Sequence, residues 1–324
     1  MTPLRSPRLQ RSELAVPATS PRFFAKAAAS AADVIFLDLE DAVAPAKKVE
    51  ARAQAITALN DIDWGTKTLA VRVNGLDTPW AHHDILEVAE RAPRLDMILL
   101  PKAGSAFDVQ FVAQILTLVE RQTGRAKRTG IEVLIETAKG VANVEAIAQA
   151  SDRLEAMIFG VGDYTVEMRT YDEVFGTPSP RYSMLTHGDA SGRERHWNDQ
   201  WHFAMARIAN ACRAYGLRPI DGPFTDFRDA EGYRASAQRA AALGFEGKWA
   251  IHPSQVDLAN EAFSPTAAQL AWATRVTALM EETTRAGQGA VGADGVLVDM
   301  AHLKMADALV QRQALIDVSA RRGR

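Results

Sequence analysis

The chain has 324 residues, of which 47% are hydrophobic and 24% are charged, so it can bury a large core in one barrel or in two ordinary domains. Its formal net charge of −3 argues against a nucleic-acid scaffold. A single cysteine, Cys212, excludes an internal disulfide and a thiolate metal cluster and indicates a reducing compartment. No run approaches the ~20 apolar residues that span a bilayer. The N-terminus MTPLRSPRLQRSEL lacks a hydrophobic signal region, so we expect a cytoplasmic protein without a membrane partner.

Short apolar runs of strand length alternate with longer Ala-rich stretches that have helical spacing. The predicted strands are residues 14–17, 33–40, 68–75, 97–102, 131–137, 156–163, 217–223 and 248–253. Such alternation implies parallel strands joined by right-handed crossovers, and eight units within ~250 residues fit a (β/α)8 TIM barrel. A doubly wound open sheet is the alternative, but no GxGxxG turn follows the first strand. We therefore predict a barrel domain over residues 1–264.

Two segments do not fit the strand–helix repeat. Residues 165–200 are polar, contain prolines and glycines, and separate the sixth and seventh predicted strands. A long insertion at that point lies on the active-site face of a barrel, so we expect a lid or a subunit contact. Residues 265–324 follow the barrel and are predicted to form a helix, a turn at GADG, the apolar run VLVD and a final helix. This C-terminal helical lid extension is expected to be a separate module that also serves oligomerisation.

A polar or charged side chain stands at the end of nearly every predicted strand. These residues are Asp38, Glu40, Asp41, Arg72, Asn74, Lys102, Glu136, Asp163, Asp221 and His252. In a barrel, the carboxyl ends of the strands hold substrates and metals. Glu136 and Asp163, from neighbouring strand ends, are the sparse oxygen set that Mg²⁺ accepts, and the planar fork of Arg72 suits a carboxylate. Together, these strand-end residues predict a metal-assisted enzyme that acts on an anionic substrate.

The acids also have a structural interpretation. A carboxylate that closes a strand often caps the following helix. This fits Asp38 and Asp41, because DAVAPAKKVE begins a helix, and it fits Glu136 and Asp163 less well, because neither is followed by an immediate helix start. Asp299, just ahead of MAHLKMADALVQ, has the position of a helix N-cap.

The basic residues have structural alternatives as well. Arg72 and Lys102 would alternatively pair with Asp38 or Glu40 inside the barrel. His252 stands before a proline, which is typical of a packed turn histidine rather than a ligand. A single strand-end residue is weak evidence for a functional site, whereas the full set of polar strand-end residues is stronger evidence.

Several stretches together resemble the citrate lyase β-subunit-like (HpcH–HpaI aldolase) family of acyl-CoA lyases, and most closely its malyl-CoA lyases. The resembling segments, in order along almost the whole chain, are RSELAVPA, ADVIFLDLEDAVAP, VRVNGLDTPW, DMILLPKAG, EVLIETAKGVANVEAI, FGVGDY, RPIDGPFTDF, GFEGKWAIHPSQVDLANEAFSP and GVLVDMAHLKMADAL. The resemblance implies a (β/α)8 barrel, Mg²⁺ or Mn²⁺, coenzyme A thioesters, and a C-terminal lid that serves a neighbouring subunit of a trimer or hexamer.

The same resemblance implies reversible cleavage of (S)-malyl-CoA to acetyl-CoA and glyoxylate, and of β-methylmalyl-CoA to propionyl-CoA and glyoxylate. A malyl-CoA thioesterase and a citramalyl-CoA lyase are alternatives within the family. A non-catalytic acyl-CoA-binding protein on a retained barrel is an alternative from another class.

Carried over residue by residue, the resemblance assigns Glu136 and Asp163 to the metal. It assigns Arg72 to the oxyanion and carboxylate of the keto-acid. Asp299, in the VLVD run, matches the acid that exchanges a proton with the acetyl-CoA methyl group from across a subunit interface. This role is not exclusive of an N-cap.

Binding positions follow from the same resemblance. Lys26 matches a coenzyme A contact, as do the backbone positions at Ile251 and His252. Gly162 matches a backbone position next to the metal that helps to hold the small acid. The supporting rim consists of Asp38, Glu40, Asp41 and Lys102.

Two features differ from the family's pattern. Near the first strand the chain has Ala15 and Ser20, where related lyases often carry an aromatic residue and an arginine. The stretch TVEMRTYDEVFGTPSPR after Asp163 also differs, and we expect it to shape the substrate pocket.

Overall fold

A computed structural model describes residues 7–170, 174–188 and 192–322. Eight parallel strands close into a barrel in the order β1-β10-β9-β6-β5-β4-β3-β2, which confirms the predicted (β/α)8 fold. The barrel strands are β1 (Ser12–Pro17), β2 (Val34–Asp38), β3 (Thr68–Arg72), β4 (Met97–Leu100), β5 (Gly130–Ile135), β6 (Leu154–Phe159), β9 (Arg218–Asp221) and β10 (Gly247–Ala250).

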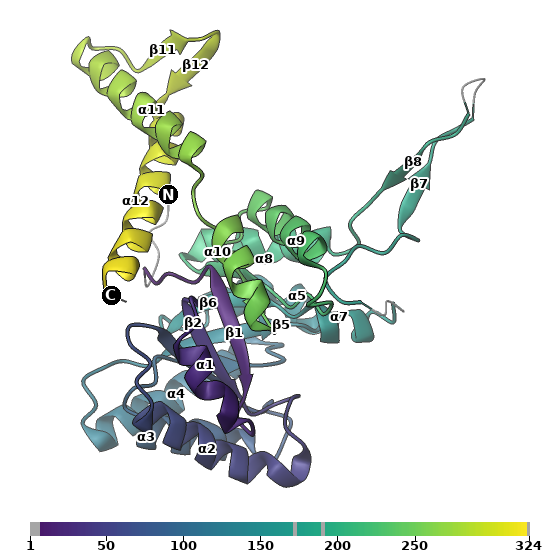
Figure 1. The fold of residues 1–324 in the computed structure, drawn as a ribbon, viewed down its shortest axis with the longest axis vertical. Coiled ribbons are helices and arrows are strands. Elements are labelled where there is room, and N and C mark those ends of the chain that lie inside the picture. The colour runs from purple at the N-terminus through teal and green to yellow at the C-terminus, as the bar shows by residue number, and fades with distance from the viewer. Residues whose placement is uncertain (1–6, 171–173, 189–191, 323–324) are drawn as a thin grey trace. The chain divides into compact units, whose positions relative to one another are not determined.

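Helices follow the strands and surround the barrel (Figure 1). They are α1 (Phe24–Ala28), α2 (Lys48–Asp61), α3 (Ala81–Arg91), α4 (Ala106–Thr123), α5 (Ala138–Ala142), α6 (Val144–Gln149), α7 (Val161–Glu167), α8 (His202–Tyr215), α9 (Ala230–Ala242) and α10 (Val256–Ala262), with 3-10 turns η1 (Pro21–Phe23), η2 (Pro45–Lys47) and η3 (Pro253–Gln255). Helix α4 begins and ends at recognisable capping residues. At its start Asp108 Oδ2 accepts a hydrogen bond from Ser105 N (2.8 Å), and at its end Gly124 adopts a left-handed conformation with φ 68°. Within the described ranges, no helix has the length and apolarity needed to cross a membrane.

The barrel interior is filled. Alternation along the strands sends one set of side chains inward, where they form an apolar cluster of Val34, Phe36, Ala70, Met97, Leu99, Leu134, Ala156, Ile158, Ile220 and Trp249. Nearer the strand starts, Gln10 Nε2 donates to Glu13 Oε2 (3.1 Å) and to Glu132 Oε2 (2.8 Å). Burial, and then the charge of Glu132, raise the pKa of Glu13. Because these side chains fill the interior, a ligand would bind at the carboxyl ends of the strands.

The insertion between β6 and β9 contains the end of α7 and an antiparallel hairpin, β7 (Ser183–Leu185) and β8 (Arg195–Trp197). Three large apolar side chains on this hairpin, Met184, Leu185 and Trp197, are exposed. The earlier part of the insertion returns to the barrel, because Phe175 N donates to Thr225 Oγ1 (3.0 Å) in the loop after β9. The lid or subunit-contact role of the insertion stays a prediction.

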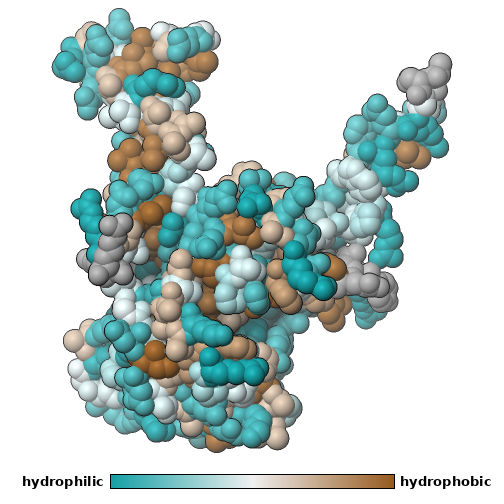
Figure 2. Space-filling model, in the orientation of Figure 1, coloured by the Kyte–Doolittle hydropathy of each residue, from teal (hydrophilic) through white to brown (hydrophobic). Residues whose placement is uncertain are grey.

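The chain divides into two compact units, the second of which begins at Ser264. The second unit contains α11 (Ala267–Arg285), β11 (Ala290–Ala293), β12 (Val296–Asp299) and α12 (Met300–Arg322). Strands β11 and β12 pair in antiparallel fashion around the GADG turn, and the unit has its own small core of Ala273, Val276, Met280, Val298 and Ala306. Figure 2 shows apolar residues at the surface of this unit, where Val296 and Leu297 are exposed.

Candidate functional site

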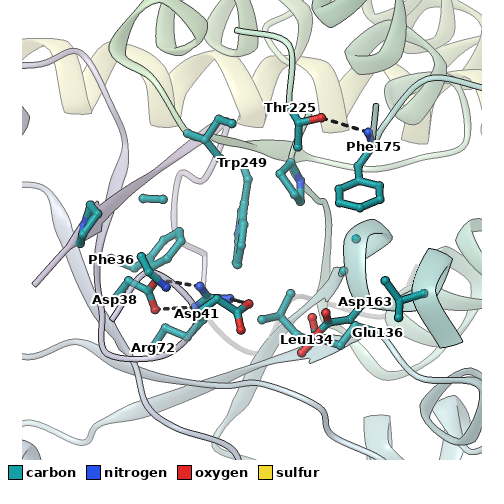
Figure 3. A pocket seen from close by; sticks show the side chains of 18 residues that line it. Phe36, Asp38, Asp41, Arg72, Leu134, Glu136, Asp163, Phe175, Thr225 and Trp249 are labelled. Carbon is teal, nitrogen blue, oxygen red and sulfur yellow. Dashed lines mark hydrogen bonds and ion pairs between the residues drawn. The ribbon is translucent and has the colours of Figure 1, made fainter. Parts of the chain in front are cut away.

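A cavity of about 470 Å³ opens at the carboxyl ends of the barrel strands (Figure 3). Its volume lies in the range of small-molecule sites. The charged lining residues come from β2, β3, β5 and β6 or from the residues just after them; they are Asp38, Asp41, Arg72, Glu136 and Asp163. An apolar wall comes from β1, the loop after β9, and β10 with the residue after it; it includes Ala15, Pro17, Pro223, Trp249 and Ile251. The cavity therefore has a charged side and an apolar side.

Strand alternation explains why three charged side chains point into the mouth. Asp38, Arg72 and Glu136 each stand two residues after a side chain that packs inside the barrel. Those interior side chains are Phe36, Ala70 and Leu134, respectively. The next inward-facing position along each strand lies beyond the apolar cluster, at the rim of the barrel. The apolar cluster therefore packs beneath the three charged side chains.

Arg72 is held by the acids that follow β2. Its Nε and Nη2 each lie 2.7 Å from one oxygen of Asp38, and its Nη1 lies 2.9 Å from Glu40 and 3.4 Å from Asp41. Although burial opposes the charged form, the Asp38 carboxylate and its acidic neighbours hold the pKa of Arg72 above its ordinary value. The Nε–Nη2 fork is thus filled by Asp38, as the structural alternative predicts, and Nη1 is paired with Glu40. A ligand carboxylate would meet the remaining N–H groups of Nη1 and Nη2.

Glu136 is buried against the backbone that follows β4. Its Oε1 accepts a hydrogen bond from Lys102 N (2.8 Å), and Lys102 adopts φ 54°. A left-handed conformation is costly for a lysine, and such strain gathers at functional sites. Burial, followed by the charges of Asp163 and Glu40, raises the pKa of Glu136 to about 8. A cation at this position would favour the ionised carboxylate.

Asp163 meets the acids of the β2 loop. Carboxylate oxygens of Glu40, Asp41 and Asp163 lie within 4.8 Å of one another. Lys102 Nζ lies 2.9 Å from Glu40 and 3.6 Å from Asp163, so it pairs with a rim acid as the structural alternative predicts. Asp163 Oδ2 is buried and accepts no hydrogen bond from the described residues. Oxygen ligands of this kind fit a divalent cation. Of the two predicted metal ligands, this cluster contains Asp163 and does not include Glu136.

One sequence expectation about these acids is wrong. Both strand ends lead directly into helices, because α7 begins at Val161 and places Asp163 in its first turn, while Thr137 Oγ1 accepts from Gly140 N (2.9 Å) to start α5 just after Glu136. The short loops of a tight barrel leave little room between strand and helix. Gly162, in the same turn as Asp163, lines the cavity.

Asp38 stabilises a turn and does not cap a helix. Its carboxylate accepts hydrogen bonds from Glu40 N (2.8 Å) and Ala42 N (3.3 Å), whereas α2 begins only at Lys48. Lys48 Nζ then donates to the Glu40 carbonyl (2.8 Å) and fixes the same turn. The Asp41 side chain is 60% exposed, which leaves it free to reach into the cavity mouth.

Asp221 does not belong to the rim. Ile220 packs inside the barrel, so the next side chain points outward to the helices. There Asp221 forms a buried ion pair of 2.6 Å with Lys248, whose amine lies 5.6 Å from the ring of Tyr233 on α9. The expectation of a functional Asp221 is replaced by a structural ion pair.

The predicted coenzyme A contacts lie at separate positions. Lys26 is exposed on α1, and Ile251 lines the cavity with its N–H donated to Gln255 Oε1 (2.8 Å). His252 is exposed rather than packed; its ring stacks on Phe227, with 4.8 Å between the ring centroids, and its Nδ1 lies 2.9 Å from Ser254 Oγ. Their roles toward a ligand stay predictions.

Asp299 lies in the second unit. Its Oδ1 accepts a hydrogen bond from Ala301 N (2.9 Å) and lies 2.8 Å from His302 Nδ1, so it caps α12 as its sequence position predicts. The hydrogen bonds from His302 and from the backbone hold the pKa of Asp299 below its ordinary range. A proton-transfer role in a neighbouring subunit stays a prediction.

Sequence reasoning missed the aromatic lining of the cavity. Phe36 and Trp249 have ring centroids 4.5 Å apart, and the Arg72 guanidinium carbon lies 5.5 Å from the Trp249 ring. Inward alternation would have found both, because each stands two residues before a predicted site residue, Asp38 or Ile251. Phe175, which also lines the cavity, lies in the stretch after Asp163 that is expected to shape the substrate pocket, although no periodic signal there singles it out.

The HpcH/HpaI aldolase/citrate lyase family matches residues 11–253. An L-malyl-CoA/beta-methylmalyl-CoA lyase from Cereibacter sphaeroides (strain ATCC 17025 / ATH 2.4.3) is 47% identical over 310 residues, which cover 95% of this chain and 96% of that lyase. A (3S)-malyl-CoA thioesterase from the same strain is 35% identical and covers 90% of each chain. The crystal structure of CitE from Mycobacterium tuberculosis in complex with magnesium, acetoacetate and coenzyme A has 31% identity and a TM-score of 0.72, and covers 95% of this chain and 99% of that one. This chain therefore belongs to the HpcH/HpaI aldolase/citrate lyase family.

Proposed function

We propose that the protein is a metal-dependent carbon–carbon lyase. Its reaction is the reversible cleavage of (S)-malyl-CoA to acetyl-CoA and glyoxylate, and of β-methylmalyl-CoA to propionyl-CoA and glyoxylate. The observation that carries this proposal is the 47% identity, over nearly the full length of both chains, to a lyase named for both substrates, against 35% for a malyl-CoA thioesterase. The charged side of the cavity supports it, because it offers acids for a cation and an arginine for an anion.

The acids of the rim would hold Mg²⁺ or Mn²⁺. Glu136 and Asp163 are the proposed ligands, with Glu40 and Asp41 beside them. The buried Oδ2 of Asp163, which accepts no hydrogen bond from the described residues and has only a 3.6 Å ion pair with Lys102, and the raised pKa of Glu136 support a cation at this place. When bound, such a metal polarises the oxygen atoms of the oxo-acid and offsets their negative charge.

Arg72 is proposed to face the oxo-acid half of the substrate. The acids around it keep the guanidinium charged, and Asp38 fixes the plane of the fork through two hydrogen bonds. In the condensation direction, negative charge develops on the former aldehyde oxygen, and a preorganised cation stabilises that charge without rearrangement. Gly162 would leave room for the small acid beside the rim.

Asp299 is proposed to transfer the proton on the other half. In cleavage, the hydroxyl group gives up its proton to solvent water and becomes the aldehyde of glyoxylate as the bond between the hydroxyl-bearing carbon and the methylene carbon breaks. The electrons of that bond pass to the thioester enolate, and the methylene carbon takes a proton from Asp299. In condensation, the Asp299 carboxylate removes a proton from the acetyl-CoA methyl group. Loss of the His302 contact in a water-free site would make this carboxylate a stronger base.

The proposed assembly is a homo-oligomer, a trimer or a hexamer, in which Asp299 acts in a neighbouring subunit. Oligomers of identical chains usually close with point-group symmetry, so every active site would receive the same acid. Coenzyme A would be held by Lys26 and by the backbone at Ile251 and His252. The apolar side of the cavity suits the uncharged carbon chain of an acyl thioester.

The test is a product assay on the purified protein with malyl-CoA, β-methylmalyl-CoA and citramalyl-CoA. Each substrate is assayed after chelation and again after Mg²⁺ or Mn²⁺ is restored. We expect metal-dependent release of glyoxylate, with acetyl-CoA from the first substrate and propionyl-CoA from the second. Accumulation of free coenzyme A and malate in place of acetyl-CoA would identify a thioesterase, and the absence of turnover with all three substrates would refute the lyase.

A further inference from the structure

The ring of Phe175 forms the cavity wall on the same side as Glu136 and Asp163 (Figure 3). We propose that Phe175, held in place by Thr225, is a specificity-determining residue that restricts the oxo-acid product to glyoxylate and disfavours pyruvate. This role rests on the proposed lyase function. The substrate feature that Phe175 would discriminate is the substituent on the hydroxyl-bearing carbon. That carbon carries a hydrogen in malyl-CoA and a methyl group in citramalyl-CoA.

Phe175 packs beside Gly162, the residue that precedes Asp163, one of the acids proposed to hold the metal. A Cβ atom built on Gly162 would lie 3.5 Å from Cδ2 and 3.6 Å from Cε2 of the Phe175 ring, which is ordinary van der Waals contact. Asp163 is the next residue of the same helical turn. The Phe175 ring therefore borders the part of the cavity where the oxo-acid half of the substrate would lie. The thioester half would lie away from this ring.

The Phe175 backbone is fixed on both sides by the loop after β9. Phe175 N donates to Thr225 Oγ1 (3.0 Å), and Thr225 N donates back to the Phe175 carbonyl (3.1 Å). The next residue, Gly176, has φ 96°, and a Cβ atom on it would lie only 2.9 Å from the Pro223 carbonyl oxygen. Only glycine accommodates this close approach and this backbone conformation. The ring thus belongs to a fixed wall.

A rigid cavity wall can discriminate between substrates that differ by a single methyl group. An apolar pocket discriminates one methylene or methyl by about 10- to 200-fold in kcat/KM. Discrimination against the larger substituent requires that the wall does not retreat, and the paired hydrogen bonds of Thr225 provide that restraint. Shortening Phe175 removes ring atoms next to Gly162 and creates room for the methyl group.

The experiment measures kcat/KM for citramalyl-CoA and for malyl-CoA and compares the ratio of the two among variants. Phe175→Ala should raise the ratio about tenfold or more, and Phe175→Leu, which keeps an apolar side chain, should raise it less. Thr225→Val removes the hydroxyl acceptor and should also raise the ratio, whereas Thr225→Ser keeps the hydroxyl and should restore the wild-type ratio. The matched control is Phe107→Ala, a 66% exposed phenylalanine on α4, which should leave both substrates unaffected.

The outcomes separate the two proposals. A ratio within about twofold of wild type in both Phe175 variants would overturn the specificity role, because one methyl group is worth at least about tenfold in an apolar pocket. Equal ratios for Thr225→Val and Thr225→Ser would overturn the part played by the Thr225 hydrogen bond. Failure of the wild-type protein to cleave malyl-CoA or β-methylmalyl-CoA would refute the lyase function itself, and this is a different result from an unchanged ratio.

Discussion

Replacing Glu136 by glutamine is expected to stabilise the metal-free protein while it removes metal-dependent turnover. Burial, and then the charges of Asp163 and Glu40, raise the pKa of Glu136 to about 8 from an ordinary 4.5. Between these pH values the unfolded chain has released its proton, whereas the folded protein must keep it or bury a charge. The stability that Glu136 contributes is therefore complete below pH 4.5 and is lost as the pH rises to about 8.

The size of the effect follows from the separation of the two pKa values. Each pH unit within the window costs about 1.4 kcal/mol of folding free energy. The loss is then about 2 kcal/mol at pH 6 and about 4 kcal/mol at pH 8. A glutamine does not titrate, and its side-chain oxygen can still accept the hydrogen bond from Lys102 N. Glu136→Gln should therefore exceed the wild type in stability by these amounts when no metal is present.

Urea unfolding in the presence of a chelator, at pH 6 and at pH 8, measures this gain. The control is Glu145→Gln on α6, where the glutamate side chain is 59% exposed and the change should stay within about 0.5 kcal/mol. Adding Mg²⁺ should reverse the order, because a ligand that binds only the folded state stabilises the wild type by mass action. A variant no more stable than the wild type at pH 8, or a gain that is larger at pH 6 than at pH 8, would refute the argument.

Three further outcomes are expected. Asp299→Asn should lose the exchange of acetyl-CoA methyl protons with deuterated solvent, measured by NMR, together with lyase turnover, while it binds Mg²⁺ as before; undiminished turnover would remove Asp299 from the mechanism. Arg72→Lys keeps the charge but loses the fork, so steady-state kcat/KM should fall by about 100-fold or more, and a fall of only a few-fold would show that the fork is dispensable. Lys248→Met leaves Asp221 buried without its cation and should destabilise the protein to urea by about 3–5 kcal/mol. The double variant with Asp221→Asn should recover much of that loss, and a double variant as unstable as the single one would contradict the ion-pair argument.

The barrel was predictable because its strands are short apolar runs and its helices have their own period. All eight predicted strands overlap observed barrel strands, since buried parallel strands need no polar alternation and are easily recognised. The same logic placed Arg72 and Glu136 at strand ends. It did not reveal that Asp221 faces the helices, because that depends on which residue of β9 enters the barrel.

Only some contacts of the site could be read from the sequence. The sequence predicts Asp38 and Glu40 as alternative partners of Arg72, but the two-point contact with Asp38 depends on a turn after β2, which a hydrogen bond from Ala42 N to Asp38 helps to shape. The left-handed conformation of Lys102 depends on tertiary packing, since nothing in the local sequence favours it. Phe175 lies at the cavity where its backbone hydrogen-bonds to Thr225, in a loop 50 residues away in the chain. Such features depend on tertiary contacts between segments that are distant in the sequence.

The two sides of the cavity depend on strand pairings of very different sequence separation. The charged side is built by residues between Asp38 and Asp163, from strands that are neighbours both in the chain and in the barrel. The apolar side needs β1 to pair with β10, where Glu13 lies opposite Trp249 at the far end of the domain sequence. Closing so long a loop is entropically costly and slow. A chain whose last strand has not yet docked would therefore already gather the acids that attract a cation, and would still lack the surface that receives an acyl group.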